Sequence, residues 1–232
     1  VGSEMCIRDS FVATSRILRP VIRRSRLPIP AANVLAEPAK RNTAGCLAWV
    51  AAEIMARFPG ADPSLAIVTA DHLIGKPEKF RAKLKAALRE AENQGTIVTL
   101  GIEPDRPEEG YGYIEVPKER LGDAGALPVF RFREKPSLQL AEEFLAAKNF
   151  FWNSGMFFWK ISTFLREMEL ASPAHAAATR AIAEALSARK AKAAEEIFLT
   201  LTDISIDYAL LEKSKTVSVV RADFPWDDVG AW

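Results

Sequence analysis

The sequence predicts an α/β fold in which a mainly parallel sheet is flanked by helices. Short apolar runs at residues 65–69 and 96–102 predict buried strands. Between them, apolar residues recur at helical spacing over residues 80–91, and Gly95 follows where a helix commonly stops. A strand, a helix and a second strand in this order favour a right-handed parallel crossover.

The other elements follow from periodicity, caps and breaking residues. A helix is predicted from Thr43 to Phe58, where Pro59 ends it, and Ser137 is predicted to cap a helix that reaches Lys148. No repeat or linker is evident, so residues 11–232 are predicted to form one domain. The remaining helices are predicted near residues 164–168, 173–194 and 205–213, and the remaining strands near residues 33–35, 111–116, 129–133, 156–159 and 216–221.

The composition is that of an ordinary globular chain. With 232 residues, of which 49% are hydrophobic, the chain is long enough to bury a core. Its 31 basic and 30 acidic residues nearly cancel, which argues against nucleic acid or an anionic membrane as a partner. No apolar stretch approaches the roughly 20 residues of a spanning helix.

The cysteines and the first residues bear on compartment and on the start of the chain. Cys6 and Cys46 lie far apart without metal-ligand spacing, which favours a reducing, cytoplasmic environment. Residues 1–10, VGSEMCIRDS, lack the pattern of a signal peptide and do not join smoothly to the segment after them. We interpret them as a non-native scar.

Carboxylates follow two of the predicted strands. Asp71 comes after an apolar run and precedes His72, and Asp227 and Asp228 follow a strand late in the chain. Ligands of open α/β sheets collect where the chain leaves the strands. Two carboxylates and phosphate oxygens would suit Mg²⁺. Residue types alone leave open that Asp71 caps a turn and that the later pair is solvated surface.

Seven segments, in order from Glu37 to Trp232, carry a resemblance to a known family. The segments are EPAKRNTA (37–44), TADHLI (69–74), GIEPDRPEEGYGYI (101–114), FREKP (132–136), WNSGMFFW (152–159), SIDYALLEK (205–213) and WDDVGAW (226–232). They resemble the motifs of the mannose-1-phosphate guanylyltransferases, a family of sugar nucleotidyltransferases. The resemblance implies a Rossmann-like, GT-A-like nucleotidyltransferase fold and an enzyme that uses Mg²⁺ to convert GTP and mannose 1-phosphate into GDP-mannose and pyrophosphate.

The resemblance implies which residues perform the reaction. It implies that Asp71 and Asp228 bind the catalytic metal and that Lys135, in the EKP motif, neutralises the sugar phosphate. A lysine would serve there as a movable point charge. Without the motif, Lys135 is better explained as a solvated residue after an edge strand.

Two further groups of residues are implied to bind the substrates. Glycine at two positions would let a sugar approach the backbone closely, although GYG and NSG are also common in turns. The helix that starts near Asn42 presents free backbone N–H groups, although Asn42 or Thr43 could simply cap it. The sugar-binding group is His72, Gly110, Gly112, Glu134 and Asn153, and the nucleotide-binding group is Glu37, Arg41, Asn42 and Thr43.

The sequence also departs from the family pattern. It contains neither the family's first strand nor its glycine-rich GGxGTRLWPLSR-like loop, so residues 11–232 are expected to form a partial nucleotidyltransferase domain with impaired turnover. Two alternatives stay open: a related sugar nucleotidyltransferase with another base or hexose, and a noncatalytic sugar-phosphate-binding or regulatory subunit. Assembly into a homo-oligomer is also open.

Overall fold

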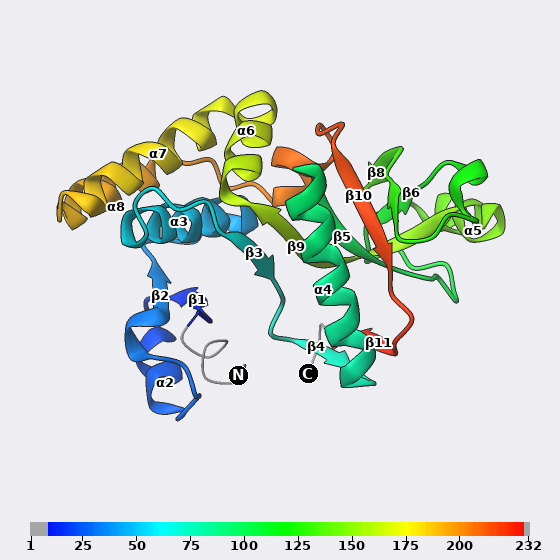
Figure 1. Cartoon of the computed structure of the whole chain (residues 1–232), viewed down its shortest axis with the longest axis horizontal. Coiled ribbons are helices and arrows are strands. Elements are labelled where there is room, and N and C mark those ends of the chain that lie inside the picture. Colours follow the sequence, from blue (N-terminus) through cyan, green and yellow to red (C-terminus); the bar gives the residue numbers. More distant parts are fainter. Residues whose placement is uncertain (1–8, 230–232) are drawn as a thin grey trace. The chain divides into compact units, whose positions relative to one another are not determined.

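A computed structural model describes residues 9–229 of the chain (Figure 1). Cys6 and most of the predicted scar over residues 1–10 lie outside the described residues, as do residues 230–232. The chain divides into two compact units, Val1–Ala61 with Ser172–Ala209, and Asp62–Ala171 with Leu210–Trp232. A single domain over residues 11–232 stays a prediction.

The first unit combines a small parallel sheet with a layer of helices. Strand β1 (Val12–Ser15) pairs in parallel with β2 (Val34–Glu37). The other elements of this unit are α2 (Arg19–Arg24), η1 (Ala31–Asn33), α3 (Asn42–Arg57), α7 (Pro173–Ser187) and α8 (Ala191–Leu199).

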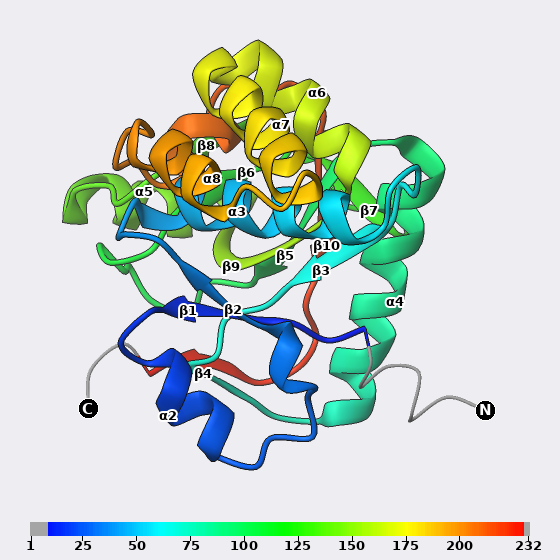
Figure 2. The ribbon, with the colours of Figure 1, turned by 90° about the vertical axis from the view of Figure 1, so that its left-hand side faces the viewer.

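The packing of α3 on α7 forms the core of the first unit. The two helices lie side by side (Figure 2), and Ala48, Ala52 and Ile182 are fully buried at their contact. Trp49 of α3 meets Phe198 of α8 edge-on, with ring centroids 5.5 Å apart. The small alanines let the helices approach closely, and the aromatic pair fills the remaining space.

The alanine-rich segment over residues 173–194 is not one helix, as the sequence predicted, but parts of α7 and α8. The chain turns between them at Arg189, whose φ of 57° is left-handed. Helical propensity alone contains no information about this break, because alanine is equally favourable on both sides of it.

The second unit contains the main sheet. Its strands follow the order β7-β10-β5-β9-β6-β8, with β3 also paired to β9, and β4 and β11 form a separate two-stranded ladder. The short π-helical η3 (Asp207–Leu211) spans the boundary between the units. The elements of the second unit are β3 (Ser64–Ile67), β4 (His72–Ile74), α4 (Pro77–Gln94), β5 (Ile97–Ile102), β6 (Tyr113–Glu115), η2 (Lys118–Arg120), β7 (Ala126–Pro128), β8 (Arg131–Arg133), α5 (Leu138–Ala147), β9 (Phe150–Lys160), α6 (Ile161–Ala171), β10 (Val217–Arg221) and β11 (Trp226–Asp228).

The prediction of a mainly parallel sheet is wrong. Among the described strands of this sheet, β5 and β10 pair in parallel, and the other neighbours are antiparallel. Strand β9 lies between β3 and β5, since Phe157 pairs with Ile67 on one side and with Thr99 on the other. Strands β3 and β5 therefore run in the same direction, as a crossover requires, but another strand separates them.

Burial on both faces of β9 explains the error. Phe158 packs on one face with Ala87 and Ala91 of α4. On the other face, Trp159 stacks on Phe164 of α6, with ring centroids 5.2 Å apart. An antiparallel strand covered on both sides has an uninterrupted apolar sequence, which is the usual signature of a parallel strand. Strand β3, predicted to be buried, is instead partly exposed.

Several local predictions are confirmed. Helix α4 ends at Gly95, whose φ of 59° is left-handed, and the Ser137 side chain accepts a hydrogen bond from the Leu140 N–H at the start of α5. Within residues 9–229, no helix combines the length and apolarity needed to cross a membrane.

Asp62 anchors the start of α6 in the second unit. Its carboxylate accepts hydrogen bonds from the Ser162 N–H at 2.8 Å and from the Ser162 hydroxyl at 2.7 Å. Partial burial raises the pKa of Asp62, but the two Ser162 hydrogen bonds and Lys160 outweigh that effect and leave the pKa below its ordinary value. The ionised carboxylate therefore stabilises the folded state.

We expect Asp62→Ala to lower the free energy of unfolding by about 1 kcal/mol at pH 7. The contribution of Asp62 should be complete above its ordinary pKa of 3.8 and should disappear as the pH falls through the lower folded-state pKa. Urea unfolding of both chains at pH 7 and pH 3 checks this, with Glu142→Ala, at an exposed carboxylate of α5, as control. An equal loss at both pH values would contradict the prediction.

Candidate functional site

The β4–β11 ladder brings together carboxylates that lie far apart in the sequence. Asp228 of β11 pairs directly with His72, the first residue of β4, and the exposed Asp71 immediately precedes β4. The Asp228 side chain is 33% exposed. Asp228 lies opposite His72 and Asp71 precedes it, so both residues of the predicted metal pair neighbour His72.

His72 is held by hydrogen bonds to one ring nitrogen. Its Nδ1 lies 2.6 Å from Thr69 Oγ1 and 3.1 Å from Trp226 Nε1. Its Nε2 lies 4.0 Å from an oxygen of Asp228. The side chain is 6% exposed, and this burial lowers the pKa of His72, although Asp228 and Asp71 partly offset the effect. The ring is therefore neutral at pH 7.

The carboxylate pair is chemically suited to Mg²⁺. This cation favours oxygen ligands and usually keeps several waters beside one or two carboxylates. In the described part of the chain, no three His, Cys, Asp or Glu side chains gather into a metal site, so Asp71 and Asp228 would share the ion with water and phosphate. The partial exposure of Asp228 leaves room for these ligands.

Three of the predicted sugar-binding residues meet beside β9. The Asn153 N–H donates to the Gly112 carbonyl at 2.8 Å. A Cβ added to Gly112 would lie 2.5 Å from Glu134 Oε2 and 3.5 Å from the Asn153 Cβ, so only glycine fits without a shift. Gly110 lies in the preceding loop, where its N–H donates to Glu108 at 3.2 Å.

The amide of Asn153 is oriented by its neighbours. Its Oδ1 accepts from the Gly155 N–H at 3.3 Å and lies 3.0 Å from the hydroxyl of Thr99, a fully buried residue of β5. These donors assign the oxygen to the β5 side of the amide. Thr99 had no motif to mark it, so sequence reasoning missed its part in the site.

Lys135 combines an exposed side chain with a strained backbone. Its φ is 44°, in the left-handed region that costs a residue other than glycine about 1 kcal/mol or more. Its Nζ lies 3.6 Å from Glu134 Oε1, and the Lys135 side chain is 64% exposed whereas that of Glu134 is 15% exposed. The geometry presents a movable cation beside a nearly buried carboxylate.

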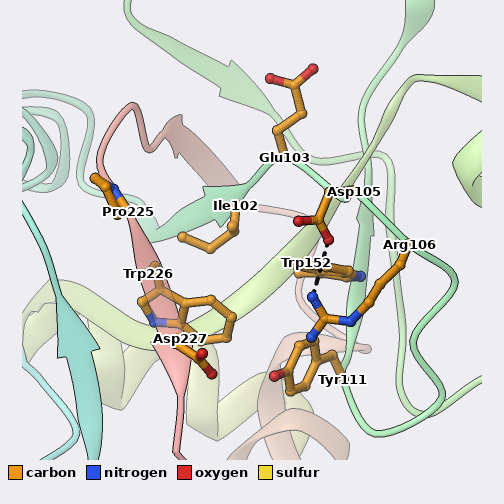
Figure 3. Close-up of a pocket in the computed structure, with 9 residues that line it drawn as sticks. All are labelled: Ile102, Glu103, Asp105, Arg106, Tyr111, Trp152, Pro225, Trp226 and Asp227. Atoms are coloured by element: carbon orange, nitrogen blue, oxygen red, sulfur yellow. Dashed lines mark hydrogen bonds and ion pairs between the residues drawn. The ribbon is translucent and has the colours of Figure 1, made fainter.

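A pocket of about 370 Å³ in the second unit is lined by Tyr111, Trp152 and Trp226, among other residues (Figure 3). Tyr111 lies between Trp152 and Trp226, with edge-on ring contacts at 5.2 and 5.4 Å. Arg106 lies over Trp152 and pairs with Asp105 at 3.1 Å. The lining residues are Ile102, Glu103, Asp105, Arg106, Tyr111, Trp152, Pro225, Trp226 and Asp227.

The charge of Asp228 acts on Tyr111, one of the residues that line this pocket. Burial raises the pKa of Tyr111, and the charge of Asp228 raises it further. Trp226 lines the pocket and also donates a hydrogen bond to His72, and Thr69 contacts the same ring nitrogen. Sequence analysis did not single out either residue, although both lie inside motifs that it recognised.

The predicted nucleotide-binding residues lie in the first unit, where β2 ends and α3 begins. Glu37 Oε2 is buried and has no hydrogen-bond partner among the described residues. Burial and the nearby Asp203 raise the pKa of Glu37, and Lys40 opposes them. An unsatisfied acceptor at this position is costly unless a ligand supplies a donor.

The other three residues have contacts within the first unit. The Arg41 guanidinium donates to the Leu199 carbonyl at 2.9 Å, and the Thr43 hydroxyl accepts from the Ile206 N–H at 2.8 Å. The prediction that Asn42 or Thr43 occupies the N-cap is wrong, because Arg41 does so without a side-chain cap. Asn42, with a φ of 55°, is the first helical residue, and its side chain bonds to the adjacent Thr43 N–H instead.

Comparisons with known proteins identify the family of the chain. A family model described as Nucleotidyl transferase matches residues 15–232. The chain is 37% identical over 204 residues to a mannose-1-phosphate guanylyltransferase of Escherichia coli strain K12, covering 86% of this chain and 42% of the relative. It is 40% identical over 209 residues to the xanthan biosynthesis protein XanB of Xanthomonas campestris pv. campestris, covering 89% and 43%. The chain thus spans less than half the length of these relatives.

Two solved structures have folds similar to that of this chain. A structure from Thermus thermophilus, described as a mannose-1-phosphate geranyltransferase, matches with a TM-score of 0.82 and 36% identity, covering 96% of this chain and 61% of that one. A structure from Helicobacter pylori, described as a mannose-6-phosphate isomerase, matches with a TM-score of 0.77 and 26% identity, covering 97% and 86%.

The surroundings of Glu37 also predict the reactivity of Cys46 in α3. Burial, with the charge of Glu37 adding to it, raises the pKa of the Cys46 thiol to about 12. Because the thiolate is the nucleophile, we expect iodoacetamide at pH 8 to alkylate Cys46 roughly a hundredfold more slowly in the folded chain than in urea. Mass spectrometry of the Cys46 peptide measures both rates, and equal rates would refute the prediction.

Proposed function

Because the chain belongs to the nucleotidyl transferase family, we propose that it forms the catalytic part of a mannose-1-phosphate guanylyltransferase. The proposed reaction joins GTP and mannose 1-phosphate to give GDP-mannose and pyrophosphate. The observation that carries the proposal is the pairing of β4 with β11, which gathers Asp71, His72 and Asp228 in the unit that also holds the sugar-binding residues. The similarity to guanylyltransferases supports the same choice.

The reaction requires positioning and charge neutralisation rather than a covalent enzyme intermediate. A phosphate oxygen of mannose 1-phosphate would attack the α-phosphorus of GTP in line, the new P–O bond forming as the bond to pyrophosphate breaks. Asp71 and Asp228 would hold Mg²⁺, which neutralises developing charge on the phosphates when bound. Lys135 would neutralise the sugar phosphate and so orient its attacking oxygen.

The sugar would lie against the backbone at Gly112. Glu134 can accept hydrogen bonds from sugar hydroxyls, and Asn153, whose amide is oriented by Thr99, offers a further polar contact. Sugar rings pack well on aromatic side chains and bare backbone, and Gly112 provides the latter. These groups would fix the hexose while Lys135 binds its phosphate.

Glu37 is suited to recognition of guanine. The Watson–Crick edge of guanine presents two adjacent N–H donors, and a carboxylate presents two acceptor oxygens. Binding of this base would satisfy the buried Oε2, which otherwise has no partner among the described residues. Adenine presents one donor and one acceptor at that edge and would match a carboxylate less well.

The decisive experiment measures pyrophosphate release from GTP and mannose 1-phosphate with Mg²⁺. It is run on the 232-residue chain and on the same chain preceded by a family-type segment with the glycine-rich loop. We expect little turnover by the first chain, turnover by the second, and loss of at least about 100-fold in the second with Asp228→Asn. Comparison of GTP, ATP, UTP and dTTP then defines the base.

Two results would change the proposal. Turnover with a different nucleotide or hexose phosphate would identify a related sugar nucleotidyltransferase. Absence of turnover in both chains, with binding of mannose 1-phosphate retained in calorimetry, would favour a noncatalytic sugar-phosphate-binding subunit.

For the base, we expect Glu37→Gln to shift preference from GTP towards ATP by about tenfold in kcat/KM, because an amide presents one acceptor and one donor. Pyrophosphate release with each nucleotide, in the chain carrying the glycine-rich segment, measures the change. Glu196→Gln makes the same chemical change at an exposed carboxylate of α8 and serves as the matched control. An unchanged GTP-to-ATP ratio would remove Glu37 from base recognition.

For the sugar, we expect Gly112→Ala to raise the KM for mannose 1-phosphate by about tenfold, because the added Cβ displaces Glu134. The KM for GTP should stay nearly constant. Gly122→Ala is a matched control, since a Cβ there meets nothing within 4 Å. Equal KM values for the two variants would show that Gly112 has no part in sugar binding.

A further inference from the structure

We propose that Trp226 is a positioning residue whose indole N–H keeps His72 in the tautomer with its proton on Nε2, the nitrogen beside Asp228. The inference concerns the chain without bound metal or substrate. Its importance for the reaction rests on the proposed role of Asp228 as a metal ligand. Trp226 would act on Asp228 through His72 and not by contact with the metal.

The direction of one hydrogen bond establishes the tautomer. An indole N–H can only donate, so the 3.1 Å contact between Trp226 Nε1 and His72 Nδ1 requires Nδ1 to accept. The neutral imidazole then carries its single proton on Nε2. Thr69 Oγ1 lies 2.6 Å from the same Nδ1, so its hydroxyl and the Trp226 N–H share the single Nδ1 lone pair.

The opposite tautomer would leave the partly buried Trp226 N–H without its acceptor. A proton on Nδ1 could still be donated to Thr69 Oγ1, but two donors would then face each other and the hydrogen bond from Trp226 would be lost. Ring packing opposes a compensating movement of Trp226. Its indole meets His72 edge-on at 5.1 Å and Tyr111 edge-on at 5.4 Å.

Other tryptophans show that this hydrogen bond is not a general property of buried indoles. The Nε1 atoms of Trp49 and Trp152 are buried and have no hydrogen-bond partner among the described residues. Trp226 differs because the β4–β11 ladder pairs it with Ile74, two residues from His72, and so places it against the ring of His72.

The consequence lies at Asp228. The His72 Nε2 is 4.0 Å from its carboxylate, so an Nε2–H directs the positive end of its dipole to that side, whereas a bare Nε2 would direct a lone pair there. Groups that orient a ligand from behind typically change metal affinity by about 10–100-fold when removed. Trp226 would therefore affect Asp228 through two steps without contacting the metal.

The test reads the tautomer directly by long-range ¹H–¹⁵N NMR of the histidine rings at pH 8. The chain contains two histidines, and His175 lies in the first unit, so its signals serve as an internal control. We expect the Nε2–H pattern for His72 in the unmodified chain. Trp226→Phe, which keeps an aromatic ring but removes the N–H, should give a mixture of both tautomers, and Trp49→Phe should leave His72 unchanged.

A second readout measures binding of Mn²⁺ alone by electron paramagnetic resonance. We expect Trp226→Phe to raise the Kd for Mn²⁺ by about tenfold and Trp49→Phe to leave it constant. Predominant Nδ1–H in the unmodified chain, which needs no variant to fold, would overturn the inference. So would an unchanged His72 pattern in Trp226→Phe.

The same data separate this inference from the proposed function. If the His72 tautomer responds to Trp226 as expected while Mn²⁺ binding is unaffected by Asp228→Asn, the positioning contact stands and the metal role of Asp228 fails. If Mn²⁺ binding depends on Asp228 but Trp226→Phe leaves the His72 tautomer unchanged, the metal site is supported and the inference fails.

Discussion

The antiparallel insertion of β9 between β3 and β5 is the constraint on which the second unit depends. It leaves β9 buried on both faces, by α4 on one and α6 on the other. The register of β5 against β9 shifts between Thr99 and Gly101, so the place of Asn153 depends on this irregularity. Gly101 pairs with Asn153 across the sheet, and the oriented amide follows from that pairing.

The ladder between β4 and β11 positions the carboxylates Asp71 and Asp228. It joins residues more than 150 positions apart and sets Asp228 opposite His72. Desolvation of His72 lowers its pKa, and two hydrogen bonds to Nδ1 offset the loss of water. An aromatic series from His72 through Trp226 and Tyr111 to Trp152 extends this ordered region into the pocket.

Local signals in the sequence were reliable where one residue decides the structure. Gly95 ends α4 and Ser137 caps α5 as predicted, because a left-handed turn and a side-chain acceptor act over only a few residues. The cap of α3 was wrong, since Thr43 is used instead to bind the distant Ile206 N–H. The break at Arg189 was missed because it depends on how α8 returns to pack on α7.

By itself, the sequence determined the α/β class, most of the helices and strands, and motifs that identify the family, because these depend on periodicity and on short runs of residues. Only the tertiary structure decided the strand order, since a strand buried on both faces has the same apolar sequence whether its neighbours are parallel or antiparallel. It also decided the roles of Thr69, Thr99 and Trp226. Their functions are hydrogen bonds to residues brought near by folding, and no spacing along the chain encodes such partners.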